Sequence, residues 1–90
     1  MDAVLKVSSK SNANLVAQAL AGTIRDSGRA QLHAIGAGAI NQAVKAVAIT
    51  RNMFAQSGAE IDLVCVPSFE DITIDDQVRT SIRLVVEPRG

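Results

Sequence analysis

The chain has 90 residues, 48% of them apolar, and its nine basic side chains balance nine acidic ones. This length and apolar content are enough for one core and exclude a second domain, so we expect residues 1–90 to form a single domain. The zero net charge excludes the bulk basicity of a protein that coats nucleic acid and confines any polyanion site to a local patch.

Few residues offer redox, metal or stacking chemistry. The single Cys65 cannot form an internal disulfide, and with His33 it makes no closed set of metal ligands, so we expect neither a metal nor a cofactor. No segment has the length of a membrane-spanning helix or the pattern of a signal peptide, which favours a soluble cytoplasmic protein. Two Phe and no Trp or Tyr disfavour the recognition of nucleic acid by base stacking.

The first part of the chain predicts strand, helix and strand. Residues 3–8 alternate between apolar and mixed positions, as in a strand. The polar residues 8–12 favour a turn and a helix N-cap, and apolar residues then recur at helical spacing until Gly28, which is typical of a helix C-terminus. Residues 30–35 predict a short second strand before the turn Gly36-Ala37-Gly38.

Residues 39–54 predict a second helix with two apolar stripes. The stripe that the sheet can cover contains Ile40, Ala43, Val44, Val47 and Phe54. The other stripe contains Ala39, Ala46, Ile49 and Met53. We expect a second subunit to cover it, which makes Ala46, Ile49 and Met53 dimer contacts. The alternative is that the first helix packs alongside and covers it.

The last part of the chain predicts two strands. Residues 61–66 are apolar on both faces, as in a central strand, Pro67 bends or bulges that strand, and residues 72–74 extend it. Asp75-Asp76 is a turn candidate, and the alternation over residues 79–86 predicts an antiparallel fourth strand. The order βαβαββ indicates an α/β two-layer sandwich, in which two helices cover one face of a mixed four-stranded sheet that ends in a long hairpin.

The residues do not indicate a catalytic centre, and we expect a protein that is not an enzyme. His33 lies in mid-strand and Cys65 in an apolar strand, positions typical of a structural histidine and an inert thiol. The adjacent acids Glu70-Asp71 and Asp75-Asp76 point to opposite faces of a strand. They favour a solvated hairpin tip over an acid–base pair or a dedicated cation loop.

Two segments fit anion binding better. Gly36 and Gly38 connect a strand to a helix, where small residues let N–H groups converge on a phosphate, although a packing role explains them equally well. Asn41 replaces the third glycine of a dinucleotide fingerprint, which disfavours NAD. The other segment, at the start of the first helix, offers hydroxyls, a cation and N–H groups, with an ordinary N-cap as the alternative. Its residues are Lys10, Ser11 and Asn12.

If the first two strands pair in parallel, both segments lie at one edge of the sheet. Lys10 and Lys45 can then face one phosphate track, with Asn41 between them and Arg25 and Arg51 as further candidates. Such a thin basic stripe predicts weak binding by one subunit, and a twofold dimer would double the contacts.

Three segments resemble the stage V sporulation protein S (SpoVS) family: residues 5–11 (LKVSSKS), 34–49 (AIGAGAINQAVKAVAI) and 79–89 (RTSIRLVVEPR). The match spans almost the whole chain. The family is similar, more distantly, to the Alba superfamily of small dimeric nucleic-acid-binding proteins. This resemblance implies an Alba-like fold and a small cytoplasmic regulator of spore development, which binds nucleic acid as a homodimer or tetramer.

The resemblance also implies site residues. In Alba proteins a lysine before the first helix contacts the nucleic-acid backbone, and Lys10 matches that place. Lys45 matches a lysine within the second helix, whereas Gly36-Ala37-Gly38 lacks the arginine that is usual there. Alba proteins place a basic hairpin on DNA, but the hairpin of this chain is acidic. Its acidic residues are Glu70, Asp71, Asp75 and Asp76.

Three functions remain open. The first is a regulator that contacts the backbone of DNA or RNA through Lys10, Ser11, Asn12, Gly36, Gly38, Asn41 and Lys45. The second is a protein-interaction module in which the acidic hairpin recognises a basic partner or adds a strand to it. The third is the binding of a small phosphorylated ligand at the glycine turn.

Overall fold

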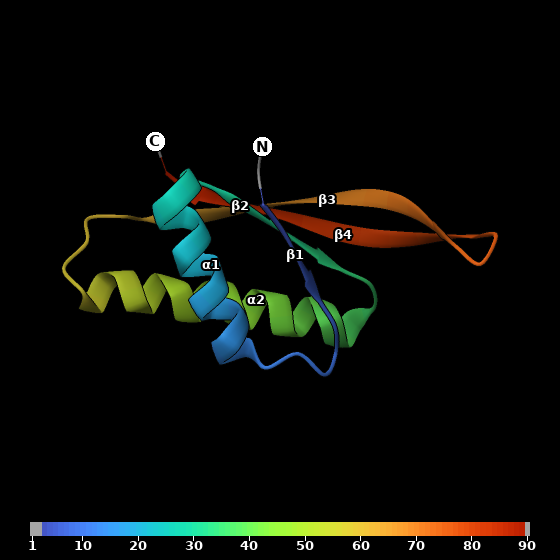
Figure 1. The fold of residues 1–90 in the computed structure, drawn as a ribbon, viewed down its shortest axis with the longest axis horizontal. Helices are drawn as coiled ribbons and strands as arrows, with labels where there is room; N and C mark the ends of the chain where they lie inside the picture. Colours follow the sequence, from blue (N-terminus) through green and yellow to red (C-terminus); the bar gives the residue numbers. More distant parts are fainter. Residues whose placement is uncertain (1–2, 90) are drawn as a thin grey trace.

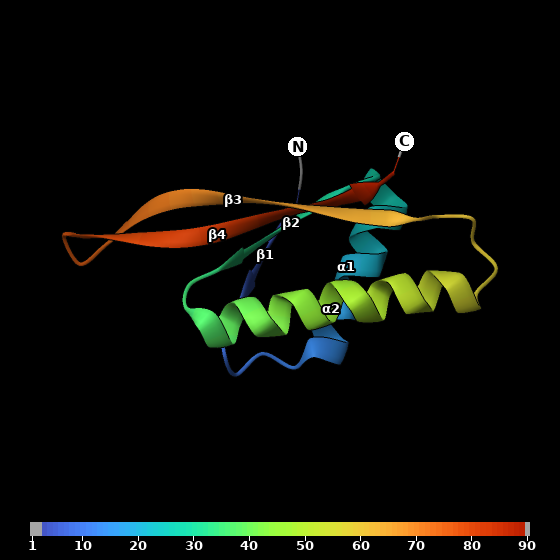
Figure 2. The same ribbon diagram turned by 180° about the vertical axis from the view of Figure 1, so that it is seen from behind.

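The computed structural model describes residues 3–89, which fold in the order βαβαββ (Figure 1). The elements are β1 (Ala3–Val7), α1 (Ala13–Ser27), β2 (Ala30–Ala34), α2 (Ala37–Gln56), β3 (Leu63–Ile74) and β4 (Gln77–Pro88). Both helices lie against one face of the sheet, and views from opposite sides show the same two layers (Figure 1, Figure 2). The structure confirms the predicted α/β two-layer sandwich with a mixed four-stranded sheet.

The strands lie in the order β1-β2-β4-β3. β1 and β2 are parallel, and β4 runs antiparallel to its two neighbours. β3 is therefore an edge strand, and the prediction that it is central was wrong. Only one of its two apolar faces is covered by the helices. Leu63 and Cys65 pack toward α1 and α2, whereas Val64 and Val66 lie on the outer face, away from both helices. Pro67 introduces no bulge, because an edge strand can spare its N–H.

The ends of α1 form as predicted. The side-chain oxygen of Asn12 accepts hydrogen bonds from the N–H groups of Asn14 and Leu15, at 2.9 and 3.2 Å. At the other end, the N–H of Gly28 donates to the carbonyl of Ile24 at 2.8 Å. α2 extends two residues beyond the predicted helix over residues 39–54 at each end, and it starts directly after Gly36.

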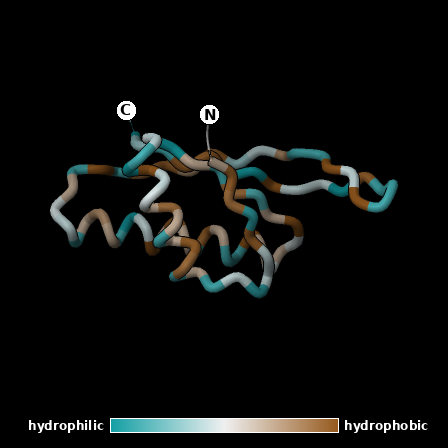
Figure 3. Tube along the Cα trace, viewed as in Figure 1, coloured by the Kyte–Doolittle hydropathy of each residue, from teal (hydrophilic) through white to brown (hydrophobic). Residues whose placement is uncertain are grey.

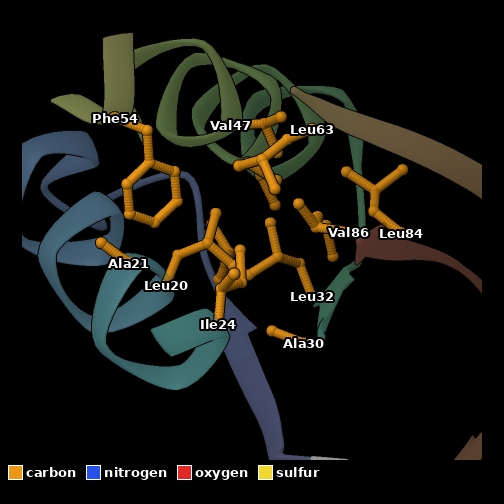
Figure 4. Close-up of a cluster of buried hydrophobic side chains, with 14 residues drawn as sticks. Leu20, Ala21, Ile24, Ala30, Leu32, Val47, Phe54, Leu63, Leu84 and Val86 are labelled. Atoms are coloured by element: carbon orange, nitrogen blue, oxygen red, sulfur yellow. The ribbon is translucent and has the colours of Figure 1, made fainter. Parts of the chain in front are cut away.

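The core fills the space between the helices and the sheet (Figure 4). β2 contributes every second residue to it, as expected for a strand with one buried face. The largest fully buried apolar side chains are Phe54, Leu20, Leu32, Leu63 and Val86. Burial of a side chain of this size stabilises the fold by about 1.5–3 kcal/mol.

The hairpin projects beyond the two-layer body (Figure 1). β2 pairs with β4 only over Ile82–Val86, so residues 70–81 form a two-stranded arm that has no further neighbour in the sheet. The predicted turn at its tip is confirmed, since Asp75 and Asp76 have φ angles of 50° and 61°, as a two-residue type I′ turn requires. The tip is hydrophilic (Figure 3).

Candidate nucleic-acid interface

The structure brings the two predicted anion segments together. Because β1 and β2 are parallel, their carboxyl ends lie side by side at the same end of the sheet. This is the end from which the arm projects (Figure 1). The side-chain amide of Gln42 in α2 donates a 2.7 Å hydrogen bond to the carbonyl of Ser11. Gly38 lies so close to the other loop that a Cβ there would sit 2.9 Å from the Cβ of Ser9. The β1–α1 loop and the start of α2 therefore form one continuous surface.

Internal hydrogen bonds order the β1–α1 loop. The hydroxyl of Ser11 accepts the N–H of Ser8 at 2.9 Å, and the hydroxyl of Ser8 accepts the N–H of Lys10 at 3.2 Å. The Asn12 side chain caps α1, which is the alternative that the sequence left open. Ser11 and Asn12 thus shape the loop, while Lys10, in the middle of the loop, is exposed.

The start of α2 differs from that of α1 because no side chain caps it. Gly36 occupies the N-cap with φ 90° and ψ 158°, a backbone conformation that essentially only glycine adopts. The N–H groups of a first helical turn carry partial positive charge, which favours anions. The packing role also applies, since Gly38 has no room for a larger side chain beside Ser9.

The exposed side of α2 continues this surface. Asn41 and Lys45 lie one helical turn apart, and both are exposed. Among residues 3–89, no carboxylate lies within ion-pair distance of Lys10 or Lys45. Both ammonium groups are therefore available to a polyanion.

Arg25 and Arg51 do not join this surface. The guanidinium of Arg25, in the last turn of α1, lies 5.0 Å from the centre of the Phe54 ring. Arg51 donates to Asp62 at 2.9 Å, and Arg89 donates to the same carboxylate at 2.7 Å. The hydrogen bond from Arg89 is the largest cause of a pKa of Asp62 below its ordinary value of 3.8, and the charges of Arg89 and Arg51 and the hydrogen bond from Arg51 lower it further. The ion pairs therefore stabilise the fold above pH 3.8, and their contribution is lost as the pH falls through the lowered pKa.

The second stripe of α2 faces α1, so Ala46 cannot be a dimer contact. Ala46 is fully buried within the chain. The hydroxyl of Thr50, also buried, donates to the carbonyls of Ala46 and of Ala17 in α1. Met53 packs against the chain's own core. The first helix, which was the alternative prediction, therefore covers this stripe around Ala46, where small side chains let the two helices approach closely.

The exposed apolar stripe of α2 lies elsewhere. Val44, predicted to face the sheet, is 53% exposed, because it lies at the margin of its stripe and beyond the reach of the sheet. Ala48, one turn further along, is also exposed, and Ile49 beside it is half-buried. Val44 and Ala48 therefore form an apolar stripe on α2 that residues 3–89 leave uncovered.

The strand register reveals a charge cluster that sequence reasoning missed. His33, Glu70 and Arg83 lie on the outer face of three adjacent strands. The Nε2 of His33 lies 3.2 Å from the Oε2 of Glu70. The Nε of Arg83 lies 3.9 Å from the same oxygen. Sequence spacing could not have found this group, because it depends on β4 lying between β2 and β3.

Cys65 is the other side chain whose chemistry the structure describes. Cys65 is half-buried, and burial raises the pKa of its thiol, which keeps the sulfur in its unreactive form. Within residues 3–89, no group of three or more His, Cys, Asp or Glu side chains is placed to hold a metal ion. In the same part of the chain, neither helix combines the length and hydropathy needed to span a bilayer.

These features define a class of small two-layer α/β protein with an ordered lysine loop beside a glycine-led helix and a two-stranded acidic arm. The model of the stage V sporulation protein S (SpoVS) family matches residues 3–89. The chain therefore belongs to this family, as its resemblance in three segments implied, and is a small protein of a sporulation-related family.

Proposed function

We propose that this protein is a non-enzymatic cytoplasmic regulator that binds the backbone of DNA or RNA as a homodimer. The observation that carries the proposal is the surface formed by the β1–α1 loop and α2. There, Lys10 and Lys45 flank the start of α2, and within residues 3–89 neither lysine has an ion-pair partner and no side chain caps that helix. The distant resemblance of the family to the Alba superfamily, with Lys10 in the place of its backbone-binding lysine, supports the same function.

The charges of the molecule set the strength and the mode of this binding. Two lysines per chain neutralise few phosphates, so the affinity depends steeply on salt and on pairing two chains. The surface has no aromatic side chain for base stacking. The contacts are therefore to the backbone and independent of sequence.

The test is fluorescence anisotropy of labelled duplex DNA and single-stranded RNA, titrated with the full chain at low and at physiological salt. We expect saturable binding that weakens steeply with salt and is lost at physiological salt in the double variant Lys10→Gln, Lys45→Gln. The control is Arg51→Gln, Arg89→Gln, which changes the net charge equally at the Asp62 ion pairs. Equal losses in both variants would mean that only the net charge matters, and no binding at low salt would overturn the proposal.

A second function is favoured by the arm. Phe69 at its base is 78% exposed and Val78 is 69% exposed, close to acidic Asp71, Asp75 and Asp76. Exposed apolar side chains beside a net acidic group of charges, here three carboxylates against Arg79, are typical of a protein-interaction surface, whose partner would be basic.

The variant Asp75→Asn, Asp76→Asn separates the two functions, because asparagine tolerates the left-handed turn without its charge. It removes repulsion and strengthens nucleic-acid binding if the first function holds. If the arm instead recognises a basic protein, the same variant leaves nucleic-acid binding absent and weakens capture of a polylysine probe.

A further inference from the structure

A pocket lies on the outer face of the sheet, which is the face that points away from the helices. It forms where β1 and β2 end beside the arm, and its volume of about 580 Å³ is within the range of roughly 300–1,000 Å³ that small-molecule sites occupy. Neither Lys10, Lys45 nor the glycine turn lines it. Its lining includes Lys6, Ser9, His33, Ile35, Ile72 and Ile74.

One part of this pocket is apolar. Ile72 and Ile74 point to the outer face from the arm, and Ile35 follows β2. Ile74 is 40% exposed and Ile35 is 38% exposed, although isoleucine is among the side chains most often buried. A ligand with an apolar body would remove this surface from water, which favours binding in proportion to the area covered.

The other part of the pocket is cationic and has hydrogen-bond donors. Lys6 is exposed, and among residues 3–89 no carboxylate lies within ion-pair distance of it. The hydroxyl of Ser9 makes no hydrogen bond within these residues. No acidic side chain lines the pocket, and the nearby Glu70 lies within ion-pair distance of His33 and Arg83. The charge of the pocket is therefore positive and unmatched.

We propose that this pocket binds a small amphiphilic anion, with a carboxylate or phosphate monoester against Lys6 and Ser9 and a short aliphatic body over Ile72 and Ile74. A polynucleotide fits it poorly, because its bases would meet isoleucine rather than an aromatic platform. The site goes beyond the proposed nucleic-acid function and does not depend on it.

The test is a titration of the full ¹⁵N-labelled chain, followed by amide chemical shifts, with octanoate, 1-octanol and inorganic phosphate as probes. We expect saturable shifts at Ser9, Ile35 and Ile74 with octanoate, and weaker binding of both other probes. The Lys6→Gln variant should bind octanoate about tenfold more weakly, as loss of a charge-assisted hydrogen bond implies. Lys10→Gln, which removes a neighbouring charge outside the pocket, should not change the affinity.

Several results would overturn the proposal. These are no saturable shift at millimolar octanoate, shifts confined to residues outside the pocket, equal affinity for octanoate and 1-octanol, or equal weakening in the Lys6→Gln and Lys10→Gln variants. Ile74→Ser is the second variant: it keeps the charges and should weaken octanoate binding, and unchanged affinity would also contradict the site. Because nucleic-acid binding is measured separately, its absence leaves these outcomes unaffected.

Discussion

Gly38 sets how closely the lysine loop and the second helix approach one another. Its missing side chain leaves just enough room for Ser9, since an added Cβ would lie 2.9 Å from the Cβ of that residue, closer than side chains tolerate. The hydrogen bond from Gln42 to Ser11 then ties the same two segments together. Because glycine at position 38 permits this close approach, the loop that carries Lys10 lies beside the start of α2.

The variant Gly38→Ala should therefore destabilise the protein by about 1–3 kcal/mol, because the loop must move to admit the methyl group. Thermal denaturation followed by circular dichroism measures the effect. The matched control is Gly22→Ala in α1, where an added Cβ meets nothing within 4 Å, so that the variant should gain about 0.5–1 kcal/mol from helix propensity. Equal effects of the two substitutions would contradict the tight contact at Gly38.

The packing of α1 on α2 explains which parts of the site could be predicted from the sequence. Helical periodicity identified both stripes of α2 but could not identify what covers them, because alanines suit a neighbouring helix as well as a second subunit. The position of Val44 was missed for a related reason: periodicity gives a direction around the helix, not the width of the sheet beneath it. The N-cap at Asn12 was predictable, since its cause is local.

Thr50 is the polar contact between the two helices. Its buried hydroxyl donates to the carbonyls of Ala17 and Ala46, so Thr50→Val, which keeps the shape, should cost about 1 kcal/mol. Urea denaturation measures this change. The matched control is Thr23→Val, whose hydroxyl bonds the Ala19 carbonyl at an exposed position within α1 and should matter little. A larger loss at Thr23 than at Thr50 would show that the contact between the helices adds nothing.

At the scale of the whole molecule, the order and type of the elements followed from the sequence, whereas the strand order did not. Each strand and helix has a local period of apolar residues, which the sequence displays. The placement of β4 between β2 and β3 depends on pairings between distant segments. This placement makes β3 an edge strand, assembles the His33–Glu70–Arg83 cluster and creates the pocket beside the arm.

The proposed homodimer can now be tested without disturbing the core. Ala48 lies on the uncovered stripe of α2, so Ala48→Glu should turn a dimer into a monomer and leave the melting temperature of the subunit unchanged. Sedimentation velocity measures the assembly. The control Gln18→Glu makes the same charge change on the exposed side of α1. A wild-type monomer at micromolar concentration, or a dimer that survives the Ala48 substitution, would contradict this interface.

The edge position of β3 has a consequence for how the protein avoids uncontrolled polymerisation. A long, flat edge strand is a template on which further chains can stack into fibrils. Pro67, in the middle of β3, has no N–H to offer an incoming strand, and the opposite edge is the five-residue β1, which carries the charged Lys6. Pro67 and the short, charged β1 therefore disfavour growth of the sheet at its two edge strands, which favours association of copies through their faces and assemblies of limited size.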